Sequence, residues 1–354
     1  MGGPTTSLWP RLAGLPLVVE TYELVRLEVP PEIGVERVTT VIRLRGGGLD
    51  GTGEDIGPFP ADHEAFVAAG PVLPLAGEWT LESFCEHVAG LDQWPEPPQW
   101  EPMRRWRNWA FEAAALDLAL RQSGRALHEA LGLEPRPLRF VNSLGLGKPA
   151  SIDTIHRRLG THPGLRFKLD VEPGWSLELM GELRATGAVD TIDFKGRYGL
   201  EVEDGDALLP MYERVLQSFP GAVLEDPHDE ADITTLLASH RDRVSFDAPI
   251  HTVDDFASLP LQPGFVNVKP CRVGSLRDLM ELYAHCAREG LHMYGGGMGE
   301  LGVGRLQIQL LASLFHPDAP NDVAPSGFNA PEPAPDLPAS PLDPRPGATG
   351  FRRA

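Results

Sequence analysis

The segments Leu165-Arg166-Phe167-Lys168, Ile192-Asp193, Val223-Leu224-Glu225, Val244-Ser245-Phe246-Asp247 and Val266-Asn267-Val268-Lys269 decide the fold. Each is a short apolar run that leads into one ionisable residue. Short apolar runs bounded by Gly and Pro are typical of buried parallel strands. The charged residues are therefore expected at one common edge, which is where α/β barrels carry their chemistry.

The intervals between these charged residues are 22 to 32 residues long, enough for one helix and two loops. Apolar residues at helical spacing predict helices at 176–186, 206–219, 232–240 and 275–289, several with Ser or Asp as a cap. Further strands at 138–143, 291–294 and 322–324 bring the count to eight. No G-x-G-x-x-G pattern follows any of the five strands that end at 168, 193, 225, 247 and 269, so an eightfold barrel is favoured over an open doubly wound sheet.

Composition excludes several classes of protein. Hydrophobic residues make up 42% of the chain, without an apolar run of membrane-spanning length or a signal pattern, so a soluble cytoplasmic protein is expected. The formal net charge of −19 disfavours a nucleic-acid partner. An anionic substrate would need a local cationic focus, which Lys168, Lys195, Lys269 and a metal ion would supply. The three cysteines have no C-x-x-C spacing and are interpreted as spectator thiols.

Three carboxylates from successive strand ends predict a metal site. Asp193, Glu225 and Asp247 are hard oxygen ligands that suit Mg²⁺, and no His or Cys accompanies them to favour zinc. Lys168 and Lys269 lie one strand outside the trio on either side, on opposite faces of a bound ligand. A lysine near a divalent cation has its pKa lowered towards that of a general base. The pattern indicates carbon-acid chemistry.

The motifs, in their order and spacing, resemble the enolase superfamily and its muconate-lactonizing subgroup over nearly the whole chain. The likeness is carried by Gly51-Thr52-Gly53-Glu54, the helix around 113–120 with Gly132 and Arg136, Arg166-Phe167-Lys168, Leu224-Glu225-Asp226-Pro227, Val268-Lys269-Pro270 with Gly274, and the run GGGMGELGVG at 295–304. The resemblance implies a (β/α)8-type, TIM-like barrel with an α+β capping domain. It divides the chain into a capping domain at 1–135, a barrel at 136–325 and a Pro-rich tail at 326–354, which is expected to pack back on the capping domain or to be partly mobile.

The resemblance also implies a chemistry. Asp193, Glu225 and Asp247 would bind Mg²⁺, with Mn²⁺ as an alternative, and Lys168 and Lys269 would be the acid/base pair. Abstraction of the α-proton of a carboxylate would give a metal-stabilised enediolate. Return of the proton on the other face is racemisation or epimerisation, whereas loss of a β-substituent is a lyase or cycloisomerase reaction of the muconate-cycloisomerase or o-succinylbenzoate-synthase type. Homo-oligomerisation is implied as well.

Departures from the family pattern mark a divergent branch. Arg166 stands where the family has a lysine, Asp193-Phe194-Lys195 replaces Asp-x-Asn, and Ala248 replaces an acid. Arg166 and Lys195 are assigned either to substrate binding or to structural ion pairs. These departures keep a non-catalytic binding protein as an alternative, and a Schiff-base aldolase is a weaker one.

Two other regions bear on the substrate. Met298 and Glu300 of the Gly-rich loop are assigned to substrate binding, against the alternatives of a core filler and a first-turn helix charge. The loops at 30–36 and 53–58 contain Gly, Pro and Ile and would suit a partly apolar lid. Such a lid favours an amino-acid or related carboxylate over a sugar acid.

The remaining segments predict the smaller domain. Residues 15–57 are expected to form a β-meander with strands at 18–29 and 38–44. Residues 106–123, rich in Ala and Leu, predict the strongest helix of the chain.

Overall fold

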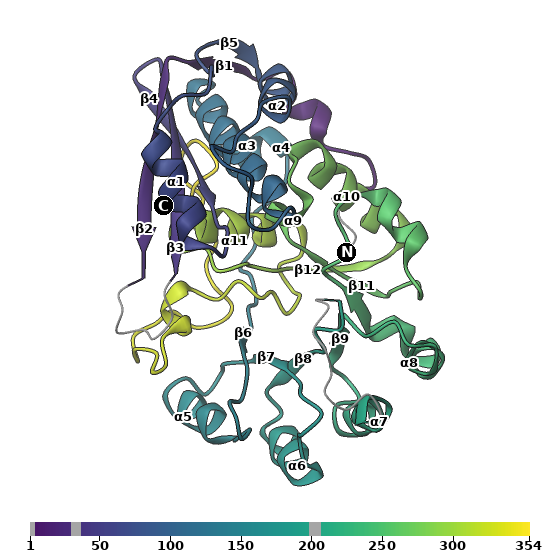
Figure 1. The fold of residues 1–354 in the computed structure, drawn as a ribbon. Helices are drawn as coiled ribbons and strands as arrows, with labels where there is room; N and C mark the ends of the chain where they lie inside the picture. Colours follow the sequence, from purple (N-terminus) through teal and green to yellow (C-terminus); the bar gives the residue numbers. More distant parts are fainter. Residues whose placement is uncertain (1–3, 30–36, 198–206) are drawn as a thin grey trace.

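The computed structural model describes residues 4–29, 37–197 and 207–354. The chain forms an antiparallel N-terminal part and a curled parallel sheet with helices around it (Figure 1). The predicted lid loop at 30–36 lies outside the described residues. No helix in the described ranges is long and apolar enough to cross a membrane.

The N-terminal part combines two antiparallel sheets with four α-helices. Its strands are β1 (Pro16–Val19), β2 (Thr21–Glu28), β3 (Val38–Gly46), β4 (Leu49–Asp55) and β5 (Gly77–Thr80). Its helices are η1 (Trp9–Arg11), α1 (Pro60–Ala69), α2 (Leu81–Ala89), α3 (Met103–Gln122) and α4 (Leu127–Leu131). One sheet has the order β2-β3-β4, and the other pairs β1 with β5.

The second part is a run of alternating strands and helices. Its strands are β6 (Asn142–Leu144), β7 (Phe167–Asp170), β8 (Val189–Asp193), β9 (Val223–Glu225), β10 (Val244–Phe246), β11 (Phe265–Val268) and β12 (His292–Gly295). Its helices are α5 (Asp153–Thr161), α6 (Leu177–Thr186), α7 (Leu208–Ser218), α8 (Ala231–Leu237), η4 (Ala238–Arg243), η5 (Val253–Ser258), α9 (Pro270–Val273), α10 (Leu276–Glu289), α11 (Val303–Phe315) and η6 (Ser326–Asn329). The seven strands form one parallel sheet in sequence order.

One short segment joins the two edges of this sheet. Asp322 forms a parallel bridge with Gly296, beyond β12, and Asn321 forms one with Phe140, ahead of β6. The strand predicted at 322–324 is therefore present as two bridges at the eighth position of the barrel. The predicted α/β fold, with a curled parallel sheet and a separate antiparallel domain, is confirmed.

Two predicted helix caps are confirmed, and the extent predicted for the first N-terminal strand was wrong. The side chains of Ser176 and Ser275 accept main-chain bonds at the starts of α6 and α10. The single strand predicted at 18–29 is divided at Glu20, whose N–H donates to Arg45 O at 2.7 Å. The two halves join different sheets, because β1 pairs with β5 and β2 pairs with β3.

Helix α3 packs on β4 through small residues. A Cβ at Gly53 would lie 2.0 Å from the carbonyl oxygen of Ala110, and one at Gly51 would lie 2.3 Å from that of Ala114. Glycine at both positions lets the helix backbone approach the strand closely. The Gly-x-Gly pattern and the Ala-rich helix, which are far apart in the sequence, are thus the two sides of one contact.

The carboxylate of Glu54, next to that contact, holds the N-terminal part on the barrel. It accepts main-chain bonds from Leu301 N (2.7 Å), Gly302 N (3.0 Å) and Gly304 N (2.8 Å), at the start of α11. The first N–H groups of a helix have no partner within it, and a carboxylate there is stabilising. The loop between β12 and α11 is therefore fixed by a residue of the smaller domain.

The last residues of the chain return to α3. Phe351 is buried, and its N–H donates to Asp117 Oδ1 at 2.9 Å. Arg352 Nε lies 2.7 Å from Asp117 Oδ2. Residues 351 and 352 thus pack against the N-terminal part, while the domain boundaries at 135 and 325 stay a prediction.

The close contact between α3 and β4 predicts that one methyl group added at Gly53 destabilises the protein. Gly53→Ala should lower the free energy of unfolding by about 1–3 kcal/mol, because overpacking of this close approach displaces the helix. The matched control is Gly181→Ala on α6, where an added Cβ meets nothing within 4 Å. The control should be neutral or stabilising by up to about 1 kcal/mol. Urea denaturation of both variants measures the difference, and equal stabilities would contradict this packing.

Candidate active site

Strand β7 ends two residues later than the sequence indicated. It spans Phe167–Asp170, whereas the predicted strand ended at Lys168. The parallel ladder sets Lys168 opposite Thr191 and Asp170 opposite Asp193 of β8. Lys168 is therefore an interior position of the strand, and the ionisable residue at its carboxyl end is Asp170.

Lys168 is enclosed by carboxylates inside the barrel, and its side chain is 1% exposed. Its Nζ lies 2.5 Å from Glu225 Oε1, 3.0 Å from Asp193 Oδ2 and 3.5 Å from Asp322 Oδ2. Burial opposes a charge on Lys168, but the neighbouring carboxylates outweigh it and raise the pKa of Lys168 well above its usual value. Lys168 is thus an ammonium ion at neutral pH.

Lys195, just beyond β8, contacts both oxygens of Asp193. Its main-chain N–H donates to Oδ1 at 3.0 Å, and its Nζ donates to Oδ2 at 2.5 Å. The same Nζ lies 3.3 Å from Asp170 Oδ1. Burial opposes ionisation of Asp193, but Lys168 and Lys195 outweigh it and lower the pKa of Asp193 to about 2.

Glu225, at the end of β9, lies at the centre of the buried network. Its Oε1 accepts from Lys168 Nζ and from Asn267 Nδ2 (3.0 Å), and its Oε2 accepts from the Tyr294 hydroxyl (2.6 Å). Burial, opposed by the ammonium of Lys168, raises the pKa of Glu225. The carboxylate is held from three different strands, so its position is fixed.

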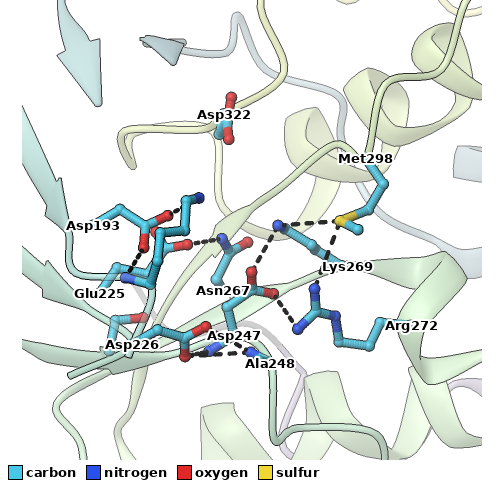
Figure 2. Close-up of polar contacts among 12 residues, drawn as sticks. Asp193, Glu225, Asp226, Asp247, Ala248, Asn267, Lys269, Arg272, Met298 and Asp322 are labelled. Atoms are coloured by element: carbon cyan, nitrogen blue, oxygen red, sulfur yellow. Dashed lines mark hydrogen bonds and ion pairs between the residues drawn. The ribbon is translucent and has the colours of Figure 1, made fainter. Parts of the chain in front are cut away.

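Asp247, just beyond β10, is paired with two cations. Lys269 Nζ lies 2.7 Å from its Oδ2, and Arg272 Nη1 lies 3.4 Å from its Oδ1. Figure 2 shows both cations also reaching Met298 Sδ, at 3.4 Å from Lys269 Nζ and 3.6 Å from Arg272 Nη2. Burial opposes ionisation of Asp247, but Arg272 and Lys269 outweigh it and lower the pKa of Asp247 below its usual value.

Asp226 positions the backbone that carries Asp247. Its carboxylate accepts from Asp247 N (2.7 Å) and Ala248 N (2.9 Å), as Figure 2 shows. Its φ of 45° is left-handed, which is uncommon outside glycine. Burial raises the pKa of Asp226 to about 7. Asp226 thus fixes the main chain at positions 247 and 248.

A cavity of about 1080 Å³ opens above this network. Cationic, acidic and apolar side chains share its walls. It is lined by Ser143, Lys148, Lys168, Asp170, Val171, Glu172, Pro173, Gly174, Phe194, Lys195, Leu208, Met211, His228, Lys269, Gly297, Met298, Gly299, Arg305, Asp322 and Asn329. The wall next to β7 and the wall next to β11 lie on opposite sides of the cavity, because these strands are four positions apart in the eight-position barrel.

Of the residues predicted to bind substrate, Lys195 and Met298 line this cavity, whereas Arg166 and Glu300 do not. Arg166 precedes β7, and its Nε donates to Asp190 Oδ2 at 2.6 Å. Glu300 is 4% exposed, and its carboxylate accepts from Met298 N at 3.0 Å. The structure therefore gives Arg166 and Glu300 structural partners instead of the cavity positions predicted for them.

Arg37 of the smaller domain supports the loop that carries Met298. Its guanidinium donates to Met298 O (2.6 Å) and to Ile56 O (2.7 Å). Ile56 belongs to the segment 53–58, which the sequence predicted as part of a lid. The segment thus contributes to the cavity indirectly, by fixing one of its walls.

Asp170, Asn267 and Tyr294 are among the polar residues of the site that the sequence did not predict. Side chains two residues apart on a strand share a face. Asn267 stands two residues before Lys269, and Asp170 stands two residues after Lys168, so alternation was the available signal for both. Nothing in the sequence distinguished Tyr294 from a core aromatic residue.

The three buried carboxylates have the donor chemistry of a magnesium site. Asp193, Glu225 and Asp247 come from neighbouring strands and are fully buried, and Mg²⁺ prefers such oxygen donors. Among residues 4–29, 37–197 and 207–354, no three acidic, imidazole or thiol groups gather closely enough to hold an ion as they stand. Lys168 and Lys195 contact the carboxylates instead. The residues fit magnesium in the kind of donor atom that they offer, and an incoming ion would compete with these lysines.

Family models match almost the whole chain. A model described as the N-terminal domain of a domain of unknown function, DUF8230, matches residues 10–130. The model of the C-terminal domain of DUF8230 matches residues 134–330.

Curated relatives include racemases and synthases. An N-succinylamino acid racemase of Thermus thermophilus is 29% identical over 86% of this chain and 85% of its own length. An o-succinylbenzoate synthase of Geobacillus stearothermophilus is 27% identical over 61% of this chain and 58% of its own length. The chain likewise spans only 60% of the length of an Amycolatopsis N-succinylamino acid racemase, which is 30% identical over 61% of this chain.

Solved structures confirm the fold expected from the resemblance to the enolase superfamily. A dipeptide epimerase of Methylococcus capsulatus, complexed with a Mg ion, has a TM-score of 0.65 at 20% identity, over 86% of this chain and 90% of the epimerase.

The two contacts between Lys195 and Asp193 predict how strongly the site binds a divalent ion. Lys195→Asn should strengthen Mg²⁺ and Mn²⁺ binding at least tenfold, or about 1.4 kcal/mol, because it removes a cation that competes for a ligand oxygen. Titration calorimetry and Mn²⁺ electron paramagnetic resonance measure the change. The control is Lys148→Asn, a lysine at the cavity rim whose side chain is 84% exposed, which should alter affinity less than twofold. Unchanged or weaker binding by the Lys195 variant would refute the competition.

Proposed function

Because the chain belongs to the DUF8230 family and has the fold of enolase-superfamily enzymes, we propose that it catalyses α-proton transfer on a carboxylate substrate. The reaction is racemisation or epimerisation of an amino-acid derivative with Mg²⁺ as cofactor. The curated relatives, named as racemases and synthases of small carboxylates, support this class of reaction.

One observation carries the proposal: ionisable side chains line the cavity on opposite sides of three buried carboxylates. Strands β8, β9 and β10 bear Asp193, Glu225 and Asp247, and the flanking strands β7 and β11 bear ionisable side chains that line the cavity. A planar intermediate held over the carboxylates would present one face to each flanking strand. Removal of a proton from one face and its return to the other inverts the carbon centre.

The residues of the site have separate roles in the proposed reaction. Lys269 borders the cavity on the β11 side, and its contacts with Asp247 and Met298 fix its amine. The sequence-predicted partner on the β7 side is Lys168. When bound to Asp193, Glu225 and Asp247, Mg²⁺ supplies positive charge for the substrate carboxylate and for the negative charge that develops on it. The buried side chains keep the surroundings of that charge dry, which strengthens every such interaction.

The cavity suits a substrate with both charged and apolar groups. Lys195 and Arg305 bring positive charge to its walls, and Phe194 and Met211 bring apolar surface. A substituted amino acid with an anionic acyl group has this combination, as in the substrates named for the racemase relatives. N-succinyl amino acids are therefore the first substrates to test. The proposal also includes that the protein is a cytoplasmic homo-oligomer without nucleic-acid or membrane partners.

A second candidate function is elimination at the same site. The identity to an o-succinylbenzoate synthase favours it. In that case one group would take the α-proton and the opposite cation would only stabilise charge, so that a β-substituent leaves. Product formation without inversion at Cα would distinguish it. A protein that binds these ligands without any proton exchange would instead be a non-catalytic binding protein.

Proton exchange tests the proposed function. In D₂O with Mg²⁺, the protein should exchange the α-proton of both enantiomers of N-succinyl amino acids, as followed by NMR, and a chelator should abolish exchange. Lys269→Met should lower exchange in one enantiomer by about 10²–10⁴-fold, the usual range for a lost general acid/base. Lys148→Met, a control at the exposed rim, should leave both rates within a factor of a few. Absence of exchange and of product across the panel, despite bound Mg²⁺, would overturn the proposal.

A further inference from the structure

Strand β7 presents two ionisable side chains to the interior, and they occupy different depths. Lys168 and Asp170 are two residues apart and therefore share a face of the strand. The ladder places Lys168 level with Thr191 and Asp170 level with Asp193, the last residue of β8. At about 3.3 Å per residue, Asp170 lies roughly 6–7 Å nearer the open end.

Lys168 borders the floor of the cavity, and buried carboxylates hold its ammonium below the open end. Its side chain is 1% exposed, and its Nζ sits between Glu225 Oε1 at 2.5 Å and Asp193 Oδ2 at 3.0 Å. To move upward, the ammonium would have to leave Glu225 Oε1 and Asp193 Oδ2, of which only Asp193 keeps a second lysine, Lys195. Separating a buried ion pair in this way is strongly unfavourable.

Asp170 has the exposure and the surroundings that Lys168 lacks. Its side chain is 37% exposed and lines the cavity. Lys195 Nζ, at 3.3 Å from Oδ1, tethers the carboxylate to the end of β8. Val171 and Pro173, which follow Asp170 in the chain, also line the cavity.

We propose that Asp170, instead of Lys168, transfers the substrate α-proton on the β7 side of the cavity, with Lys195 as its positioning residue. The inference rests on the proposed function and names a catalytic group for it. Lys168 then serves as a fixed counter-charge for Asp193 and Glu225. The reaction pairs a carboxylate on β7 with an amine on β11, in place of two lysines.

The proton balance closes over one turnover. The Asp170 carboxylate takes H⁺ from Cα, and the electron pair of the broken C–H bond enters the enediolate. The Lys269 ammonium then gives H⁺ to the opposite face of Cα. The protein is left with a neutral Asp170 carboxylic acid and a neutral Lys269 amine, which is the protonation state that the product enantiomer needs for the reverse reaction.

The test is enantiomer-resolved exchange of the α-proton in D₂O with Mg²⁺ and N-succinyl-L- and N-succinyl-D-amino acids. Asp170→Asn should lower exchange of one enantiomer at least 100-fold more than that of the other, and Lys269→Met should have the opposite selectivity. Lys168→Met should lower the exchange rates of both enantiomers by similar factors. Asp170→Glu should restore part of the exchange lost in Asp170→Asn, with the same selectivity.

The matched control is Asp190→Asn, which also removes a carboxylate from an ion pair on a neighbouring strand but lies outside the cavity. This variant should exchange the α-proton of both enantiomers at rates within threefold of wild type. Circular dichroism should show that each variant is folded. The assignment of Asp170 would be overturned if Asp170→Asn lowered the exchange rates of both enantiomers equally, or lowered neither. It would also be overturned if Lys168→Met lowered the exchange rate of one enantiomer only. Those results would leave the proposed function standing. Absence of exchange by the wild-type protein would contradict the proposed function itself, and this inference with it.

Discussion

The compensation of charge inside the barrel is the constraint on which the rest of the structure depends. Three carboxylates are buried at the ends of β8, β9 and β10, and ionised groups in such surroundings need partners. Lys168, Lys195, Lys269 and Arg272 supply them. These cations thus stabilise the buried carboxylates and also contribute to the charge of the site. Any bound divalent ion has to share the carboxylates with them.

The smaller domain helps to fix the loop that carries Met298. Glu54 occupies the start of α11, and Arg37 holds the carbonyl of Met298. Met298 in turn contacts the amine of Lys269. A continuous series of contacts therefore runs from the antiparallel sheet to the amine of Lys269, and the close packing of α3 on β4 keeps that sheet in place.

Much of this arrangement was predictable from the sequence, because buried parallel strands leave a strong pattern. The strand ends at Asp193 and Glu225 follow directly from apolar runs between turns. The end of β7 was placed wrongly at Lys168, since a strand that is buried on both faces gives no internal mark of where it stops. Arg166 and Glu300 were assigned to the substrate because a loop or strand end gives no indication of which neighbour a charge will meet. Their partners come from other segments, and only the folded chain brings them together.

The central claim is that a substrate carbon is held between β7 and β11 above the three carboxylates. A crystal structure of the protein with Mg²⁺ and an N-succinyl amino acid tests it most directly. The account predicts Mg²⁺ bound by Asp193, Glu225 and Asp247, with Cα about 3–3.5 Å from Asp170 on one face and from Lys269 on the other, the spacing of reacting atoms in a productive complex. A ligand bound away from these carboxylates, or a Cα that only one side of the barrel approaches, would contradict it.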